Sequence, residues 1–88
     1  MRLEQADPRR LIAESYRIEG IGAPECRSIF LDWAIGLPPE VNTRRALKRL
    51  LAEYALQNPD HPMTAVLRAG LDDAPVARRR GGAGGRRN

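Results

Sequence analysis

Four cations cluster over residues 44–49, where they could bind the phosphates of a nucleic acid. On a helix they share one continuous face, which consists of Arg44, Arg45, Lys48 and Arg49. Two of them, Arg44 and Arg45, fall in the expected first turn, where positive charge opposes the helix dipole. A helix start that binds an anion would tolerate such charges. The alternative is an ordinary solvated helix face.

A second group of cations lies near the end of the sequence, among glycines. It consists of Arg78, Arg79, Arg80, Arg86 and Arg87. This segment resembles the RGG-type segments that bind RNA mainly through backbone charge. It has no interleaved aromatic residues, so base stacking is not part of the expected mechanism. The alternative is a terminus that only aids solubility.

The residues of the sequence give little support for a catalytic function. No nucleophile is paired with His61, the only histidine, which is expected at a solvent-facing helix start. Cys26 lies near a helix N-terminus, where a thiol pKa can fall, but it also lies on an apolar stripe and is expected to be buried. A single cysteine excludes an intramolecular disulfide and a multi-cysteine zinc site. We therefore expect no enzyme, no metal and no cofactor.

A surface for a protein partner is the other candidate site. The helix expected to begin at Pro24 carries an apolar stripe that includes Ile29 and Trp33. Leu31 and Ile35 lie well off that stripe, and Leu37 follows the helix. Either this helix is packed on two sides at the centre of the domain, or Leu31, Ile35 and Leu37 form an exposed patch. Such a patch would bind another protein or a second copy of the chain.

Proline and glycine divide the sequence into four helix-sized segments that would position these residues. They are expected to begin at Asp7-Pro8, Pro24, Asn42 or Thr43, and Asp60, and the last is expected to end near Gly70. The third is the clearest, because apolar residues recur at helical spacing from Leu47 to Tyr54. We expect Trp33 to pack against this stripe, which consists of Leu47, Leu50, Leu51 and Tyr54.

The absence of any alternating run of strand length predicts an all-α fold. We expect an N-terminal extension over 1–6, a helical domain of four short helices over 7–73, and a disordered Arg/Gly-rich tail over 74–88. The chain has 15 basic and 11 acidic residues, but five of the arginines belong to the tail. The domain itself is therefore close to neutral.

The composition of the chain also limits the classes of protein to which it could belong. No stretch approaches the roughly 18 consecutive apolar residues of a membrane span, and no signal peptide is recognised, so a cytoplasmic location is expected. The segment 25–33 is typical of a small bacterial protein and implies no particular activity. We expect a non-enzymatic interaction or regulatory protein that acts through a helical surface. The alternative is an accessory nucleic-acid-binding protein that uses the cations of 44–49 and of the tail.

Overall fold

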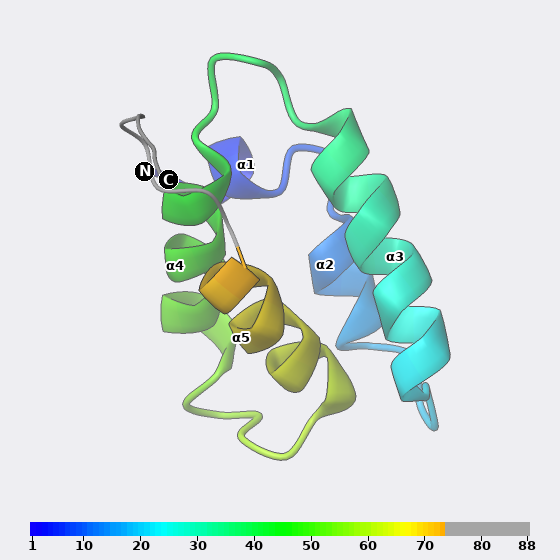
Figure 1. Cartoon of the computed structure of the whole chain (residues 1–88). Helices are drawn as coiled ribbons and strands as arrows, with labels where there is room; N and C mark the ends of the chain where they lie inside the picture. Colours follow the sequence, from blue (N-terminus) through cyan, green and yellow to red (C-terminus); the bar gives the residue numbers. More distant parts are fainter. Residues whose placement is uncertain (74–88) are drawn as a thin grey trace, which may run out of the picture.

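The computed structural model describes residues 1–73 and confirms an all-helical fold in that part of the chain (Figure 1). The helices are α1 (Leu3–Ala6), α2 (Leu11–Ser15), α3 (Ala23–Gly36), α4 (Thr43–Tyr54) and α5 (Pro62–Asp73). The tail expected over 74–88 lies outside the described residues. Within residues 1–73, no helix has the length and apolar character needed to cross a membrane.

The helix α1 is an addition to the four that the sequence predicted. It lies in the segment expected to be an N-terminal extension, and its last residue, Ala6, is fully buried. The Gln5 side chain accepts a hydrogen bond from the Arg2 backbone N–H at 2.9 Å, which caps the first turn. Trp33 donates its indole N–H to the Ala6 carbonyl at 2.7 Å. Residues 3–6 are therefore part of the folded domain.

The helix α2 begins later than the sequence predicted, at Leu11 instead of next to Pro8. Arg10 precedes it in the left-handed backbone region, with φ of 58°. Asp7 still caps this helix, because its Oδ2 accepts a hydrogen bond from the Ala13 N–H at 2.9 Å. The intervening turn explains why the proline and the helix start are separated.

The helix α3 and the start of α4 agree with the sequence prediction, but α4 ends at Tyr54, before the Asn58-Pro59 pair that was expected to end it. Glu25 accepts a hydrogen bond from the Gly22 N–H at 3.1 Å at the start of α3. Asn42 caps α4, since its side-chain oxygen accepts a hydrogen bond from the Arg45 N–H at 2.9 Å. The expected stop at Gly36 is also where α3 ends.

The helix α5 continues past Gly70, so the prediction that Gly70 ends it is wrong. Gly70 lies against the ring of Phe30 on α3, and a Cβ atom at this position would be 2.5 Å from Phe30 Cζ. This glycine therefore allows α3 and α5 to approach each other closely.

The core joins all five helices. The helix α5 packs against both α3 and α4, while α1 packs against α4 and α2 against α3 (Figure 1). Trp33 is 2% exposed and belongs to the core that contains Leu47 and Leu50, with Leu51 and Tyr54 packed at its edge. This confirms the expected place of Trp33. The fully buried aliphatic and sulfur-containing side chains around it are Ile12, Cys26, Leu47, Leu50, Met63 and Leu67.

Candidate functional site

The two apolar residues that lie off the main stripe of α3 are exposed. Leu31 is 58% exposed and Ile35 is 81% exposed. The interpretation of α3 as a helix buried on two sides is therefore wrong, because one of its sides faces solvent. Leu37 does not belong to the same surface, since it is half-buried and packs against the core.

A groove of about 430 Å³ runs between α3 and α5, with Leu31 on one wall. Its lining is mostly apolar. The residues that line it are Ala23, Arg27, Phe30, Leu31, Pro62, Ala65, Val66, Ala69, Gly70 and Asp73. Ile35 does not line the groove but follows Leu31 by one helical turn. An apolar groove with exposed aliphatic side chains on one of its helices is the kind of surface that binds an amphipathic helix.

Small side chains on α5 form the second wall of the groove. Ala65 and Ala69 are exposed there, and the contact between Phe30 and Gly70 joins the two helices. Alanine and glycine carry little hydrophobic signal in a sequence, and the apolar periodicity of α5 marks only its buried face. The groove was missed because it requires α3 and α5 to be placed side by side.

The groove carries one charge of each sign. Arg27 lies in the second turn of α3, and Asp73 is the last residue of α5. Both are exposed, and neither forms an ion pair within 4.0 Å with any residue in 1–73. Each is thus available to a charged group on a bound partner.

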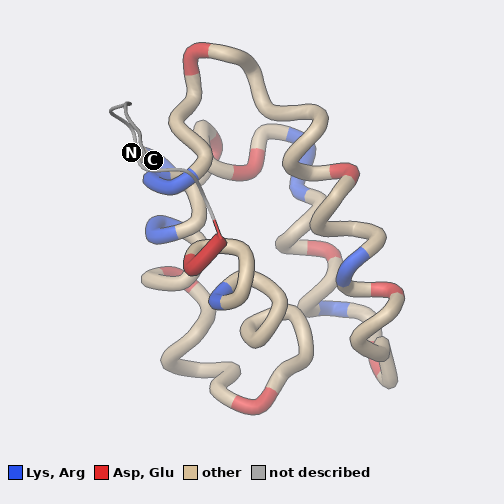
Figure 2. The backbone as a smooth tube through the Cα atoms, viewed as in Figure 1, with Lys and Arg blue, Asp and Glu red and all other residues tan. Residues whose placement is uncertain are grey.

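The cations of α4 lie on the side of the molecule away from α3, shown in blue in Figure 2. Two of the four bind their own chain. Arg44 donates to the Leu71 carbonyl at 3.1 Å, and Arg49 donates to the Met1 carbonyl at 3.0 Å and to Glu53 at 3.0 Å. Arg45 and Lys48 are exposed.

The start of α4 is also less suited to an anion than the sequence indicated. The Arg45 N–H already donates to Asn42, and the Arg44 side chain satisfies a carbonyl in the last turn of α5. The hydrogen bond to the Leu71 carbonyl gives the Arg44 side chain a partner within the chain, which accounts for one of the two cations in the first turn of α4. The second cationic group, Arg78 to Arg80 with Arg86 and Arg87, lies outside the described residues.

Cys26 is fully buried in the core, as expected for a structural cysteine. Burial raises the pKa of its thiol, and the charge of Glu25 raises it further. Since the thiolate is the reactive form, both effects disfavour nucleophilic chemistry at this residue.

His61 has a structural role that the sequence did not reveal. Its Nδ1 accepts a hydrogen bond from the Met63 N–H at 3.0 Å, which caps α5. Its ring lies 4.5 Å from that of Tyr16, which in turn stacks on Tyr54 at 4.6 Å. Burial lowers the pKa of His61 below its ordinary value of 6.5. The neutral imidazole with its proton on Nε2 is the form that fits this cap.

We expect the free energy of unfolding to decrease when the pH falls below about 6.5. Protonation of Nδ1 removes the acceptor and places a positive charge at the N-terminus of α5. Because the folded pKa lies below the unfolded one, the contribution of His61 is complete above the unfolded pKa and is lost as pH falls through the folded pKa.

Urea denaturation at about pH 7.5 and about pH 5 measures this effect. The control is His61→Asn, which keeps a side-chain acceptor but does not titrate, and it should reduce the difference between the two pH values. An equal pH dependence in His61→Asn would exclude His61 as its source.

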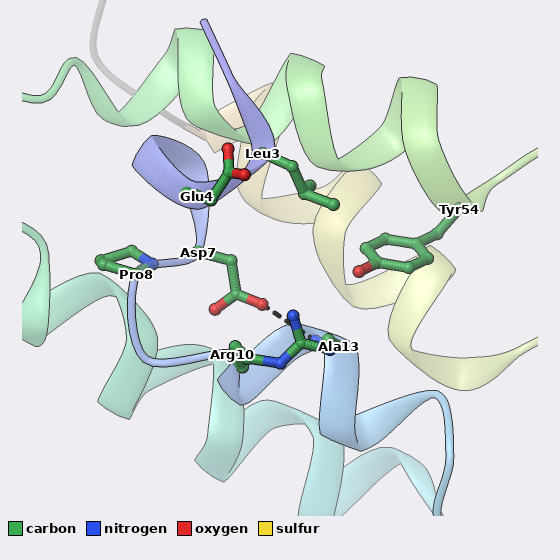
Figure 3. Close-up of a pocket in the computed structure, with 7 residues that line it drawn as sticks. All are labelled: Leu3, Glu4, Asp7, Pro8, Arg10, Ala13 and Tyr54. Atoms are coloured by element: carbon green, nitrogen blue, oxygen red, sulfur yellow. Dashed lines mark hydrogen bonds between the residues drawn. The ribbon is translucent and has the colours of Figure 1, made fainter.

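A smaller cavity of about 180 Å³ surrounds the Asp7 side chain (Figure 3). Asp7 is 4% exposed, and its Oδ1 accepts no hydrogen bond from the described residues. The lining also includes Glu4, Arg10 and Tyr54. Burial raises the pKa of Tyr54, and the negative charge of Asp7 adds to that effect. Asp7 Oδ2 accepts the hydrogen bond from the Ala13 N–H that caps α2, so we assign Asp7 a structural role.

Within residues 1–73, no group of three or more histidine, cysteine, aspartate or glutamate residues is arranged to hold a metal ion. Comparisons of the chain with models of protein families, with curated proteins and with solved structures find no match.

Proposed function

We propose that this is a small non-enzymatic interaction protein that binds another protein chain through the groove between α3 and α5. The observation that supports it is the exposure of Leu31 and Ile35, at 58% and 81%, next to an apolar groove. Exposed apolar patches of this kind are usually sites of association. We place this activity in the cytoplasm, as the sequence predicts.

The internal contacts of the cations on α4 favour this proposal over nucleic-acid binding. A phosphate contact by Arg44 would compete with its hydrogen bond to the Leu71 carbonyl. The same holds for Arg49 and its contacts with Met1 and Glu53. Only Arg45 and Lys48 are exposed on that face, which is a small charge for a phosphate-binding surface.

The proposal predicts that a photoreactive side chain at position 35 labels a bound protein in the producing cells. Ile35 is 81% exposed and lies one helical turn beyond Leu31, which lines the groove, so a label at position 35 is within reach of a partner bound there. We expect discrete adducts of higher mass, detected by electrophoresis and identified by mass spectrometry. Introducing Leu31→Glu into the same chain should abolish them, because a carboxylate would be buried at the interface.

Leu56 provides the matched control, since it is 90% exposed and lies beyond the end of α4, outside the groove lining. A photoreactive residue at position 56 should give only diffuse labelling, and Leu56→Glu should leave the adducts from position 35 intact. Equal labelling from positions 35 and 56 would contradict the proposal, as would adducts that survive Leu31→Glu in a folded protein.

A further inference from the structure

We infer that the occupant of the groove is a second copy of this chain, which binds in the antiparallel direction across a twofold axis. This inference rests on the proposed function, because it names the partner for the same surface. Two features of the groove support it, namely the charges that line the groove and the common direction of α3 and α5.

The two helices run in the same direction along the groove (Figure 1). Ala23 and Pro62, at their N-terminal ends, both line it, and further along Phe30 of α3 meets Gly70 of α5. Arg27 therefore lies toward the N-terminal part of the groove, and Asp73 lies at its C-terminal end. The two charges are separated along the groove.

A twofold axis perpendicular to the groove reverses this order in the second copy. Arg27 of each copy then lies at the same end of the groove as Asp73 of the other, so that each end of the interface can form one ion pair between the copies. The same axis places α3 of each copy over α3 of the other, so the exposed Leu31 side chains lie next to each other near the centre of the interface. A parallel arrangement would instead place each charge opposite its own kind, which is repulsive.

Net charge and size also favour a second copy. Residues 1–73 contain 10 basic and 11 acidic side chains, a net charge of −1, so two copies of this part repel each other weakly. A domain of this size buries a smaller fraction of its surface on folding than a larger domain does, and association covers apolar groups that a single copy leaves exposed.

A charge exchange tests the inference on the full chain. We expect the wild-type protein to dimerise in the micromolar to millimolar range, measured by sedimentation equilibrium. Arg27→Asp alone and Asp73→Arg alone should each weaken the dimer by about tenfold or more, because each places two like-charged pairs across the interface. An equimolar mixture of the two variants should form a heterodimer of near wild-type affinity, since every pair is then of opposite sign.

A wild-type chain that stays monomeric over the whole range would overturn the inference, and so would a mixture that fails to restore association. Adducts from position 35 that contain a different protein would overturn it too, while leaving the proposed function intact. A full-length chain that is monomeric and dimerises only after removal of residues 74–88 would also overturn the inference, because the chain's own C-terminal segment would then be the occupant of the groove. Circular dichroism verifies that each variant is folded.

Discussion

Replacing Trp33 with alanine is expected to lower the free energy of unfolding by about 3–5 kcal/mol. The side chain is 2% exposed, and its removal leaves a large cavity among the core residues of α3 and its neighbours. It also removes the hydrogen bond to the Ala6 carbonyl, which is one of the contacts that hold α1. A loss of this size is comparable with the total stability of many small domains.

Urea denaturation followed by circular dichroism measures the effect, because the variant lacks the indole that fluorescence would report. Trp33→Phe separates the two contributions, since it keeps most of the apolar volume but lacks the N–H donor. We expect this variant to lose about 1–3 kcal/mol, the cost of leaving a buried carbonyl without its partner. A Trp33→Ala protein of wild-type stability would show that the core is wrongly assigned.

Replacing Gly70 with alanine is expected to destabilise the protein by about 1–2 kcal/mol, although glycine to alanine in a helix normally stabilises by about 1 kcal/mol. A Cβ atom here would lie 2.5 Å from Phe30 Cζ and 2.8 Å from Phe30 Cε1. The Phe30 ring also packs against Trp33, with 5.5 Å between ring centroids, which limits its movement. Either the ring or the helix must shift, and both helices contribute to the groove.

Gly36 is the matched control, since it is also a helical glycine with a close neighbour. A Cβ atom at Gly36 would lie 2.7 Å from Arg9 Nη1, which is the end of a flexible side chain and moves at little cost. Gly36→Ala should therefore be neutral or stabilising in thermal denaturation, and Gly70→Ala should lower the midpoint. A stabilising Gly70→Ala would mean that α3 and α5 are further apart than described.

The sequence was most informative where local signals agree. The helix α4 has an asparagine cap and an apolar stripe at helical spacing, and the structure confirms that it begins at Thr43. It ends at Tyr54, four residues before Asn58, because the turn that precedes the Asn58-Pro59 pair is not part of the helix. The helix α3 follows the same pattern between Pro24 and Gly36. Each of these signals lies within or next to the helix that it defines, so it can be recognised from the sequence alone.

The remaining helices depend on contacts that a local pattern does not contain. The helix α1 has four residues, too few to show periodicity, and its Ala6 carbonyl is bound by a side chain 27 residues away. Asp7 caps α2 from six residues before Ala13, across a turn with a left-handed residue. Gly70 was interpreted as a helix end because close approach to Phe30 cannot be inferred from sequence spacing.

The candidate site could be predicted only in part, because it too depends on contacts between residues far apart in the sequence. Leu31 and Ile35 were identified by their positions on α3, but only the packing of the other helices determines that they are exposed. The hydrogen bonds of Arg44 and Arg49 span 27 and 48 residues, so the sequence showed their charge without their partners.

The hydrogen bond from Trp33 to α1 has an optical consequence. Trp33 is the only tryptophan of the chain, so the indole emission of the protein comes from one buried ring bonded to the Ala6 carbonyl. Its wavelength depends on whether water reaches that ring. Detachment of α1 would expose the indole N–H and shift the emission to the red, even while the other helices keep their far-ultraviolet signal. The emission wavelength of Trp33 thus reports whether α1 is attached to the rest of the domain.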